Sequence, residues 1–438
     1  MNLTTETVHN KQRKQELRSD LSYIHIMKYM GSKRELLPDI KKSVDQMVRR
    51  GSTVLDLFAG TASVGAYLKK DYNVISNDVQ DYSYVIAQAL IESSSIHITH
   101  DTHLLVFKIE QEYIKNKERL ISLLSENYKQ SNRFVDIKKG EWTDQLRLEY
   151  LKFSRSFPSP LNKFESFSTE LHSLKSRYFE KDQSVYLQTV FLFSETYFSL
   201  EQAMDIDSIR FAIDTTVNDP ILKSIFLTAL IYAYSYCSSG TGHFAMFRDL
   251  KDVNSIEDTF IYRKKRVWEY FLSKVEELFQ YHQHIPTRTY ATYSYDYVDL
   301  LKNDLIDTVD LIYADPPYSF VHYSRFYHAI ESLIKYDYDI PQYKGRYRSD
   351  RFQSPFCQKT NVLNAFKFLF EKTKEKKIKL LLSYADSGMI SLDEITYLLA
   401  NLNFSYEVHK IQYDHSTLGR KGHKSNLIHE YLIQATPL

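Results

Sequence analysis

Hydrophobic and polar positions divide the chain into stretches of different character. Towards both ends, short apolar runs rich in β-branched residues alternate with amphipathic segments, a pattern typical of an α/β protein. Between residues 91 and 284 the pattern changes to long helical periods with few strand-like runs. The sequence therefore predicts an α/β core at 23–90 and 285–438, a mostly helical insertion at 91–284 and a loosely helical arm at 1–22.

The individual elements follow from the same pattern. The predicted strands are residues 53–58, 72–76, 290–295, 311–314, 378–384 and 429–434, with an edge region at 406–413. The predicted core helices are 35–48, 66–70, 298–303, a segment ending at 336, 361–372 and 392–402. The helices predicted in the insertion are 104–128, 143–153, 184–200, 220–237 and 255–281.

A glycine-bearing turn follows the first predicted strand. It runs from Ala59 to Gly65 and leads through a helix to a second strand that ends at Asp78. This order is typical of a nucleotide-binding α/β half, in which glycines let the backbone approach a ligand and the acid bonds a ribose hydroxyl pair. Gly60 and Gly65 lack the third glycine of the dinucleotide fingerprint, which argues against a nicotinamide enzyme. Asp56 either holds a cationic cofactor group or caps the turn.

The buried strand predicted at 311–314 stops at Asp315-Pro316-Pro317-Tyr318. Neither proline can donate to a sheet ladder, so the motif is held stiffly at the carboxyl end of the strand, where ligands of open α/β sheets bind. A carboxylate and a carbonyl can grip the two N–H groups of an exocyclic amine, and an aromatic ring can stack on its base. The motif therefore suits amine methylation. The alternative is a turn with a capping Asp and a packing Tyr.

A second acid stands at a strand end ahead of this motif. Asp296 follows the predicted strand 290–295, where it suits binding of the adenine amine of a cofactor. Tyr297 is placed to pack on the adenine ring.

Clusters of basic residues are candidates for binding phosphates. Cations alternate with tyrosine in residues 344–351, and a basic loop with glycines follows at 419–424. The predicted DNA-binding residues are Lys344, Arg346, Arg348, Arg351, Arg420 and Lys421. The glycine-rich segment 238–244 is either a DNA-contacting loop or a flexible corner. The charge run 262–266 is either a solvated helix face, which we favour, or a phosphate site.

Composition limits the class of protein. The 438 residues include 56 basic and 55 acidic side chains, a formal charge of +1, so a nucleic-acid surface must be a local patch. The only cysteines, Cys237 and Cys357, have no zinc spacing and indicate free thiols in a reducing compartment, and no metal is expected. The apolar run 221–237 contains Lys223 and is short for a membrane span. We expect a soluble, cytoplasmic protein without a signal peptide.

Four segments carry a resemblance, in order: Tyr29-Met-Gly-Ser-Lys33, Asp56-Leu-Phe-Ala-Gly-Thr-Ala-Ser-Val-Gly65, Ser294-Tyr-Asp-Tyr297 and Asp315-Pro-Pro-Tyr318. Together they resemble the D12 class of DNA adenine-N6 methyltransferases, which includes the bacterial Dam methylases. The resemblance covers 23–90 and 285–438 and is weak across the insertion. It implies a Rossmann-like, S-adenosylmethionine-dependent methyltransferase core. The chain departs from the family at Tyr29, where tryptophan is common, and at Ser32, where a glycine is common.

The resemblance also implies roles for the residues in these segments. The methyl donor would be S-adenosylmethionine, and the target adenine would be flipped out of double-stranded DNA. The implied cofactor-binding residues are Tyr29, Lys33 (at the methionine carboxylate), Asp56, Phe58, Gly60 and Gly65 (around methionine and ribose), Asp78 (ribose), Asp296 and Tyr297 (adenine), and Asp315. The implied catalytic residues are Asp315, Pro316, Pro317 and Tyr318.

The predicted function is therefore site-specific methylation of adenine N6 in DNA, with the insertion as the DNA-recognition lobe. Double-stranded DNA is the expected partner, with cognate restriction or defence-system proteins as further candidates. Cytosine-N4 enzymes share the geometry but usually carry Ser in place of Asp315, and RNA-adenine or protein-amide enzymes usually carry Asn. A further alternative is an inactive DNA-binding module with a methyltransferase-like core. The recognised sequence is not predicted.

Overall fold

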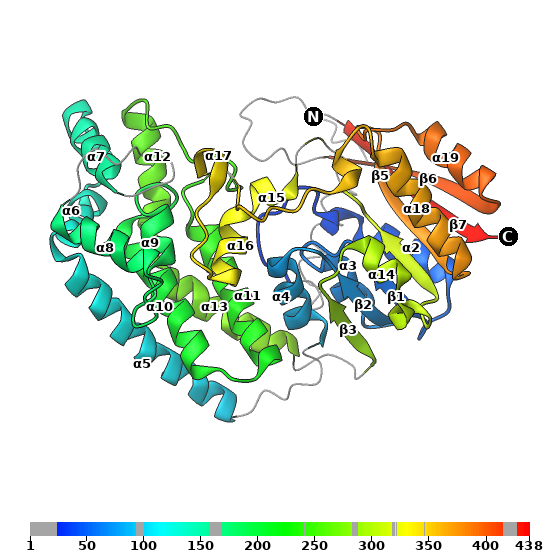
Figure 1. Ribbon diagram of the computed structural model, residues 1–438, viewed down its shortest axis with the longest axis horizontal. Coiled ribbons are helices and arrows are strands. Elements are labelled where there is room, and N and C mark those ends of the chain that lie inside the picture. The colour runs from blue at the N-terminus through cyan, green and yellow to red at the C-terminus, as the bar shows by residue number, and fades with distance from the viewer. Residues whose placement is uncertain are drawn as a thin grey trace, which may run out of the picture.

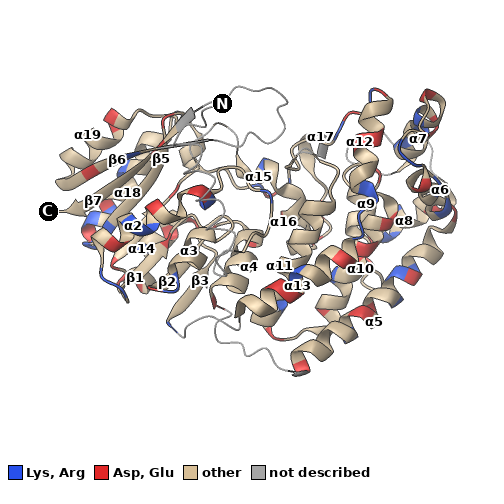
Figure 2. Cartoon of the chain, turned by 180° about the vertical axis from the view of Figure 1, so that it is seen from behind, with Lys and Arg blue, Asp and Glu red and all other residues tan. Residues whose placement is uncertain are grey.

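The computed structural model of this chain describes residues 24–92, 100–157, 168–240, 242–282, 288–317, 320, 322–345, 347–414 and 427–438. These residues form a mixed α/β structure. In Figure 1 the sheet lies at one end of the molecule and a group of helices at the other. Lys and Arg are interspersed with Asp and Glu over both ends (Figure 2), in keeping with the near-zero net charge.

The sheet has seven strands in the order β3-β2-β1-β4-β5-β7-β6. The strands β1 to β5 run parallel to one another, whereas β7 runs antiparallel to both β5 and β6. The strands are β1 (Thr53–Asp56), β2 (Asn73–Asn77), β3 (Tyr290–Tyr293), β4 (Leu311–Ala314), β5 (Lys379–Ala385), β6 (Phe404–Asp414) and β7 (Leu427–Pro437). All the strands predicted from the sequence are present, with ends shifted by up to three residues.

Alternate residues of the central strands face different hydrophobic clusters. Val54 and Leu311 belong to one cluster, and Leu55 and Ile312 to the other. Each of these side chains is fully buried, as the continuous apolar runs of parallel strands require. Because β1 to β4 are parallel, their carboxyl ends meet at one edge of the sheet.

Helices cover both faces of the sheet. The face that contains Leu55 packs against α14 (Tyr297–Lys302), α18 (Val362–Glu375) and α19 (Leu392–Asn401). The face that contains Val54 packs against α2 (Leu37–Met47), α3 (Ser63–Leu68) and α4 (Asp81–Leu90), while η1 (Lys33–Leu36) packs on α2 and α3, and α16 (His328–Lys335) packs on α4. Short elements complete this part: η3 (Asp304–Ile306), α15 (Tyr323–Phe326), α17 (Gln342–Gly345) and η4 (Pro355–Cys357).

The remaining helices lie between residues 100 and 282. They are α5 (His100–Leu123), α6 (Ser125–Asp136), α7 (Asp144–Ser156), α8 (Thr169–Phe179), α9 (Gln188–Phe193), α10 (Leu200–Thr216), α11 (Pro220–Cys237), α12 (Val253–Arg263) and α13 (Val267–His282). Their apolar residues share one cluster with the Val54 face, because α11 packs on α4 and α16. Whether this part folds as a separate domain stays a prediction.

Three predicted helices differ from the structure. The helix predicted at 104–128 breaks at Leu124 between α5 and α6, and the one at 255–281 breaks between α12 and α13. The helix predicted at 184–200 is wrong over its second half: α9 ends at Phe193, Glu195 has a left-handed φ of 58°, and Ser199 starts α10 with a capping box. Two further helices, α8 and α10, were not predicted from the sequence.

The predicted helix at 220–237 matches α11. Among the described residues, α11 is the one helix long and apolar enough to cross a membrane, and 67% of it is buried inside the protein. This burial identifies it as a core helix packed between α13 and α4.

Candidate active site

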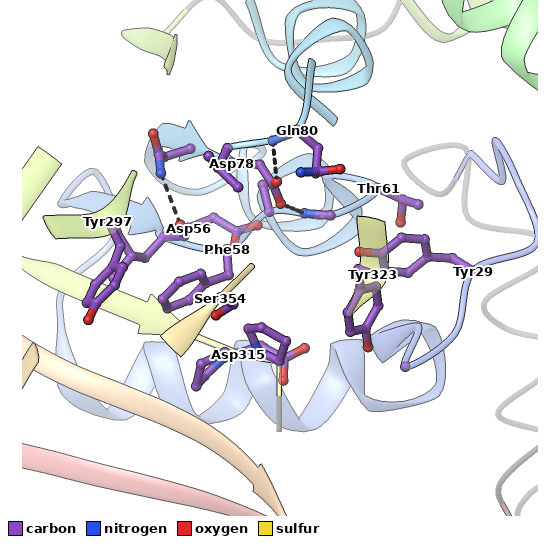
Figure 3. Close-up of a pocket in the computed structure, with 18 of the residues that line it drawn as sticks. Tyr29, Asp56, Phe58, Thr61, Asp78, Gln80, Tyr297, Asp315, Tyr323 and Ser354 are labelled. Carbon is purple, nitrogen blue, oxygen red and sulfur yellow. Dashed lines mark hydrogen bonds between the residues drawn. The ribbon is translucent and has the colours of Figure 1, made fainter. Parts of the chain in front are cut away.

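A cavity opens at the carboxyl ends of β1, β2 and β4 and encloses about 1060 Å³ of empty space, including a part open to solvent. Figure 3 shows Asp78 facing Asp315 across this cavity, with Tyr29 and Tyr297 towards opposite ends. Predicted site residues that line it are Tyr29, Lys33, Asp56, Phe58, Gly60, Asp78, Asp296, Tyr297, Asp315, Pro316 and Pro317. Predicted site residues from two distant parts of the sequence, 29–78 and 296–317, thus share one pocket.

The turn after β1 wraps around the Asp78 carboxylate. Gly60, at a left-handed φ of 54°, donates its N–H to Asp78 Oδ2 at 2.9 Å, and Gln80 donates to Oδ1 at 2.9 Å (Figure 3). Burial raises the pKa of Asp78 to about 6, although these N–H groups favour the charged form. The turn is therefore locked to the end of β2, and the carboxylate faces the cavity.

Asp56 is buried at the end of β1. Its Oδ2 accepts the N–H of Gly65 at 3.3 Å, so the capping role is present, while Oδ1 has no hydrogen-bond partner among the described residues. Burial raises the pKa of Asp56 to about 8, and the charges of Asp315 and Asp78 add to this. A nearby cation would favour the ionised form of this carboxyl group. Oδ2 caps the turn and Oδ1 is left for a cationic cofactor group, so the geometry is compatible with both predicted roles.

Gly65 does not line the cavity. A Cβ atom there would come within 2.8 Å of Ser76 Oγ and 3.2 Å of Val74, so glycine is required for close packing of α3 on β2. The structure thus gives Gly65 a packing role, and its cofactor contact stays a prediction.

Aromatic rings form two walls of the cavity. Tyr29 stacks on Tyr327 at a centroid distance of 4.9 Å and lies 5.5 Å from Tyr323. Phe58 lies 5.8 Å from Tyr297 and 5.5 Å from Phe356. These rings offer flat apolar surfaces for a planar ligand.

Asp296 caps the helix that follows β3. Its Oδ1 accepts the N–H of Val298 at 2.8 Å, and burial raises its pKa. The side chain is half-buried and lines the cavity beside Tyr297.

The Asp315 carboxylate lies in a chain of buried charges. Lys33 Nζ is 3.0 Å from Asp315 Oδ1 and 2.6 Å from Glu430 Oε1, and Ser383 Oγ donates to the same Glu430 oxygen at 2.6 Å. Burial raises the pKa of Asp315 to about 7; Lys33 opposes this shift and Glu430 adds to it. The structure thus gives the Lys33 ammonium two carboxylate partners from this chain, whereas the sequence analysis placed it at a cofactor carboxylate.

Glu430, on β7, was missed by the sequence analysis. It is fully buried, and its position inside a predicted strand of otherwise largely apolar pattern was the available signal. Tyr318, the last residue of the catalytic motif, lies outside the described residues.

The predicted DNA-binding residues differ in their surroundings. Arg348 is 3% exposed and pairs with Asp337 at 2.5 Å and Asp350 at 3.0 Å, so its prediction as a phosphate contact is wrong. Arg351 lies over the rings of Tyr347 and Tyr343, at 4.1 and 4.9 Å from their centroids. Arg346, Arg420, Lys421 and the side chain of Lys344 lie outside the described residues.

The charge run 262–266 is not a uniformly solvated helix face, and it spans the break between α12 and α13. Arg263 is buried and pairs with the equally buried Glu195 at 2.8 Å, each 1% exposed. Lys265 donates to the Tyr236 carbonyl at 2.6 Å. The favoured expectation is therefore wrong for Arg263.

The structure thus combines a nucleotide-type glycine turn and strand-end acids with a carboxylate-proline motif in one cavity. The chain belongs to the D12 class N6 adenine-specific DNA methyltransferase family, whose family model matches residues 29–166 and 162–398.

Curated relatives agree with this family. The chain is 27% identical over 422 residues to the type II methyltransferase M.FokI of Planomicrobium okeanokoites, covering 93% of this chain and 52% of the relative. It is 25% identical to the modification methylase StsI of Streptococcus sanguinis, covering 88% of this chain and 48% of the relative. It is 23% identical to the type II methyltransferase M.NlaIII of Neisseria lactamica, covering 93% and 98%. The chain therefore spans about half the length of M.FokI and StsI.

Proposed function

We propose that this protein transfers a methyl group from S-adenosylmethionine to N6 of adenine in DNA, with the target base flipped into the cavity. The observation that carries the proposal is that the Gly60 turn with Asp78 and the Asp315-Pro316-Pro317 segment line the same pocket. The parallel pairing of β1 with β4 brings these two sequence-distant segments to the same edge of the sheet, so a donor site and an amine-binding motif face one cavity.

The residues present fit the methyl donor. A Cβ atom at Gly60 would come within 3.0–3.1 Å of the Tyr29 ring, so the turn needs glycine to bring the backbone close to this wall. Asp78 would bind the ribose hydroxyls, Asp296 the adenine amine, and the unpartnered Asp56 Oδ1 the ammonium of the methionine part. Phe58 and Tyr297 would hold the adenine ring. When bound, the cofactor supplies an electrophilic methyl group.

The chain's own residues orient the nucleophile. The Asp315 carboxylate and the Pro316 carbonyl accept the two N–H groups of the target amine, which directs its lone pair into the cavity. Lys33 fixes the position of Asp315 and favours its charged form, and Glu430 with Ser383 fixes Lys33. Orientation and charge stabilisation, more than strong basicity, then drive the reaction.

The sheet order and the helices on both faces support a Rossmann-like core at 23–90 and 285–438. We propose the helical insertion at 91–284 as the DNA-recognition lobe, double-stranded DNA as partner, a cognate restriction or defence protein as a second partner, and a cytoplasmic location. The relatives M.FokI and StsI are named a type II methyltransferase and a modification methylase, and this favours such a setting.

The test compares Asp315→Ala with the wild type and with Asp393→Ala, an exposed aspartate in the first turn of α19. Transfer of labelled methyl groups to genomic DNA should fall by more than about 1000-fold in Asp315→Ala alone, since several kcal/mol of orientation is lost. Calorimetric binding of S-adenosylmethionine should change by less than about threefold in both variants. Retained methylation by Asp315→Ala would refute the catalytic assignment, and lack of cofactor binding by the wild type would refute the function.

A further inference from the structure

A cluster of cations and tyrosines lies beside the cavity and has no part in the chemistry described above. The chain segment 25–30 contacts the last turn of α11 and the middle of α13: Lys28 N–H donates to Ser235 Oγ at 3.3 Å, and Lys274 Nζ donates to the His25 carbonyl at 3.0 Å. This brings N-terminal residues next to the segment 262–266. Parts of the chain that are more than 200 residues apart thus form one surface.

Three cations of this surface converge on a single ring. Lys28 Nζ, the Arg248 guanidinium and Lys265 Nζ lie 5.6, 5.0 and 4.9 Å from the centroid of Tyr262. Each comes from a different segment: the N-terminal strip, the loop before α12, and the turn between α12 and α13. The electron-rich face of one tyrosine partly compensates each cation, but it cannot neutralise three.

Negative charge is sparse around these cations. Within the described part of the chain, no carboxylate forms an ion pair with Lys28 or Lys265, and Arg248 has only the exposed Asp258 at 4.0 Å. The Arg248 Nε also has no hydrogen-bond partner there. The pKa of Lys28 is lowered by burial and then by the charges of Lys265 and Arg248. Such like-charge crowding costs stability in the free protein and is relieved when an anion binds.

The position of the cluster links it to the cavity. Lys28 directly precedes Tyr29, whose ring lines the pocket, and the two side chains diverge because Tyr29 stacks on Tyr327 while Lys28 lies over Tyr236 and Tyr262. The loop that carries Arg248 is tied to the chain next to this wall, since Phe244 N–H donates at 2.8 Å to the carbonyl of Phe326, the residue before Tyr327. An extended anion that feeds one base into the cavity would pass this surface.

We propose that Lys28, Arg248 and Lys265 bind backbone phosphates of the DNA duplex that flank the flipped adenine. This proposal rests on the proposed function and names the anchoring surface for its substrate. Phosphate contacts, which Arg, Lys and Tyr side chains commonly make, fix the register of a protein on the duplex without reading sequence, so a surface of cations and tyrosines suits them. The tyrosines hold the cation side chains in place, which lowers the entropy lost on binding.

The test measures affinity for a duplex of mixed sequence by fluorescence anisotropy over a range of salt concentrations, with cofactor-saturated protein. Each of Lys28→Gln, Arg248→Gln and Lys265→Gln should reduce the slope of log affinity against log salt by about 1 and weaken binding about five- to tenfold near 0.1 M salt. Lys265→Arg should keep the wild-type slope, because it keeps the positive charge.

Arg50→Gln is the control. Arg50 is 72% exposed, pairs weakly with Asp71 at 3.6 Å, and precedes β1, at the opposite edge of the sheet from the cavity. It should leave slope and affinity unchanged. Unchanged slopes in all three glutamine variants would overturn the proposal. An equal reduction of the slope in Lys265→Gln and Lys265→Arg would overturn it as well. If the proposed function is wrong, the wild type will show no methyl transfer, although the salt dependence of its DNA binding can still be measured.

Discussion

Replacing Glu430 with Gln tests whether the buried charge chain sets the ionisation of Asp315. The change removes a negative charge but keeps the shape of the side chain. Lys33 Nζ lies 3.0 Å from Asp315 and 2.6 Å from Glu430, so these carboxylate oxygens are at most about 5.6 Å apart. At that separation and an effective dielectric constant of about 20, the lost repulsion is about 3 kcal/mol, or about 2 pKa units.

The sign follows from the acceptor role of Asp315. Only the ionised carboxylate accepts both a target N–H and the Lys33 ammonium, so activity should rise with pH through the raised pKa of about 7. Without the Glu430 charge the pKa of Asp315 falls, and the acid limb should move down by about 1 to 2 pH units. In Lys33→Met the lost cation raises this pKa, so the limb should move up.

The assay is kcat/KM for methyl transfer to genomic DNA between about pH 5 and pH 9, which reports the free enzyme. Ser383→Ala, which removes a hydrogen bond to Glu430 without changing charge, should leave the midpoint within about 0.3 units. Shifts in the same direction for Glu430→Gln and Lys33→Met, or none in either, would refute the reasoning.

Two further substitutions test the cofactor turn and the helical part. In Gly60→Ala the added Cβ would lie 3.0 Å from Tyr29 on a backbone with a left-handed φ of 54°, so S-adenosylmethionine binding, measured by calorimetry, should weaken about tenfold. The control is Gly140→Ala, where φ is 89° but no atom lies within 4 Å of the added Cβ, so binding should not change. Equal affinities of the two variants would contradict the crowding argument. Arg263→Met removes one partner of a pair in which both side chains are 1% exposed, and should lower the free energy of unfolding by about 3 kcal/mol in denaturant titrations. Arg133→Met removes one partner of an exposed pair with Glu149 and should lower the free energy of unfolding by less than about 0.5 kcal/mol. A similar loss in both variants would contradict a larger contribution from the buried pair.

The sequence predicted the strands of the sheet, and most of the predicted cofactor and catalytic residues line the cavity, because both follow local patterns. Short apolar runs predict strands, and turn glycines or prolines at their ends mark the ligand edge. The site roles themselves stay predictions. The contact of Glu430 with Lys33 could not be predicted from local pattern, since this pair joins residues 397 positions apart.

The helical part was harder to predict because several of its charged residues are buried. In α10, Asp207 accepts N–H groups from Thr189 and Val190, and Arg210 donates to the carbonyls of Leu333 and Ile334. These buried charges interrupt the apolar periodicity that predicts a helix. Arg348 is a similar case: the composition of its segment indicated a cationic loop, but ion pairs with Asp337 and Asp350 compensate the charge of its buried side chain.

The central claim is that the cavity methylates the amine of adenine in DNA. It is tested most directly by incubating the purified protein with DNA from a methylation-deficient host and isotope-labelled S-adenosylmethionine, digesting the DNA to nucleosides and identifying the labelled product by mass spectrometry. The account predicts label in N6-methyldeoxyadenosine and none after Asp315→Ala. Label in N4-methyldeoxycytidine, or no label in DNA while the protein binds the cofactor, would contradict it.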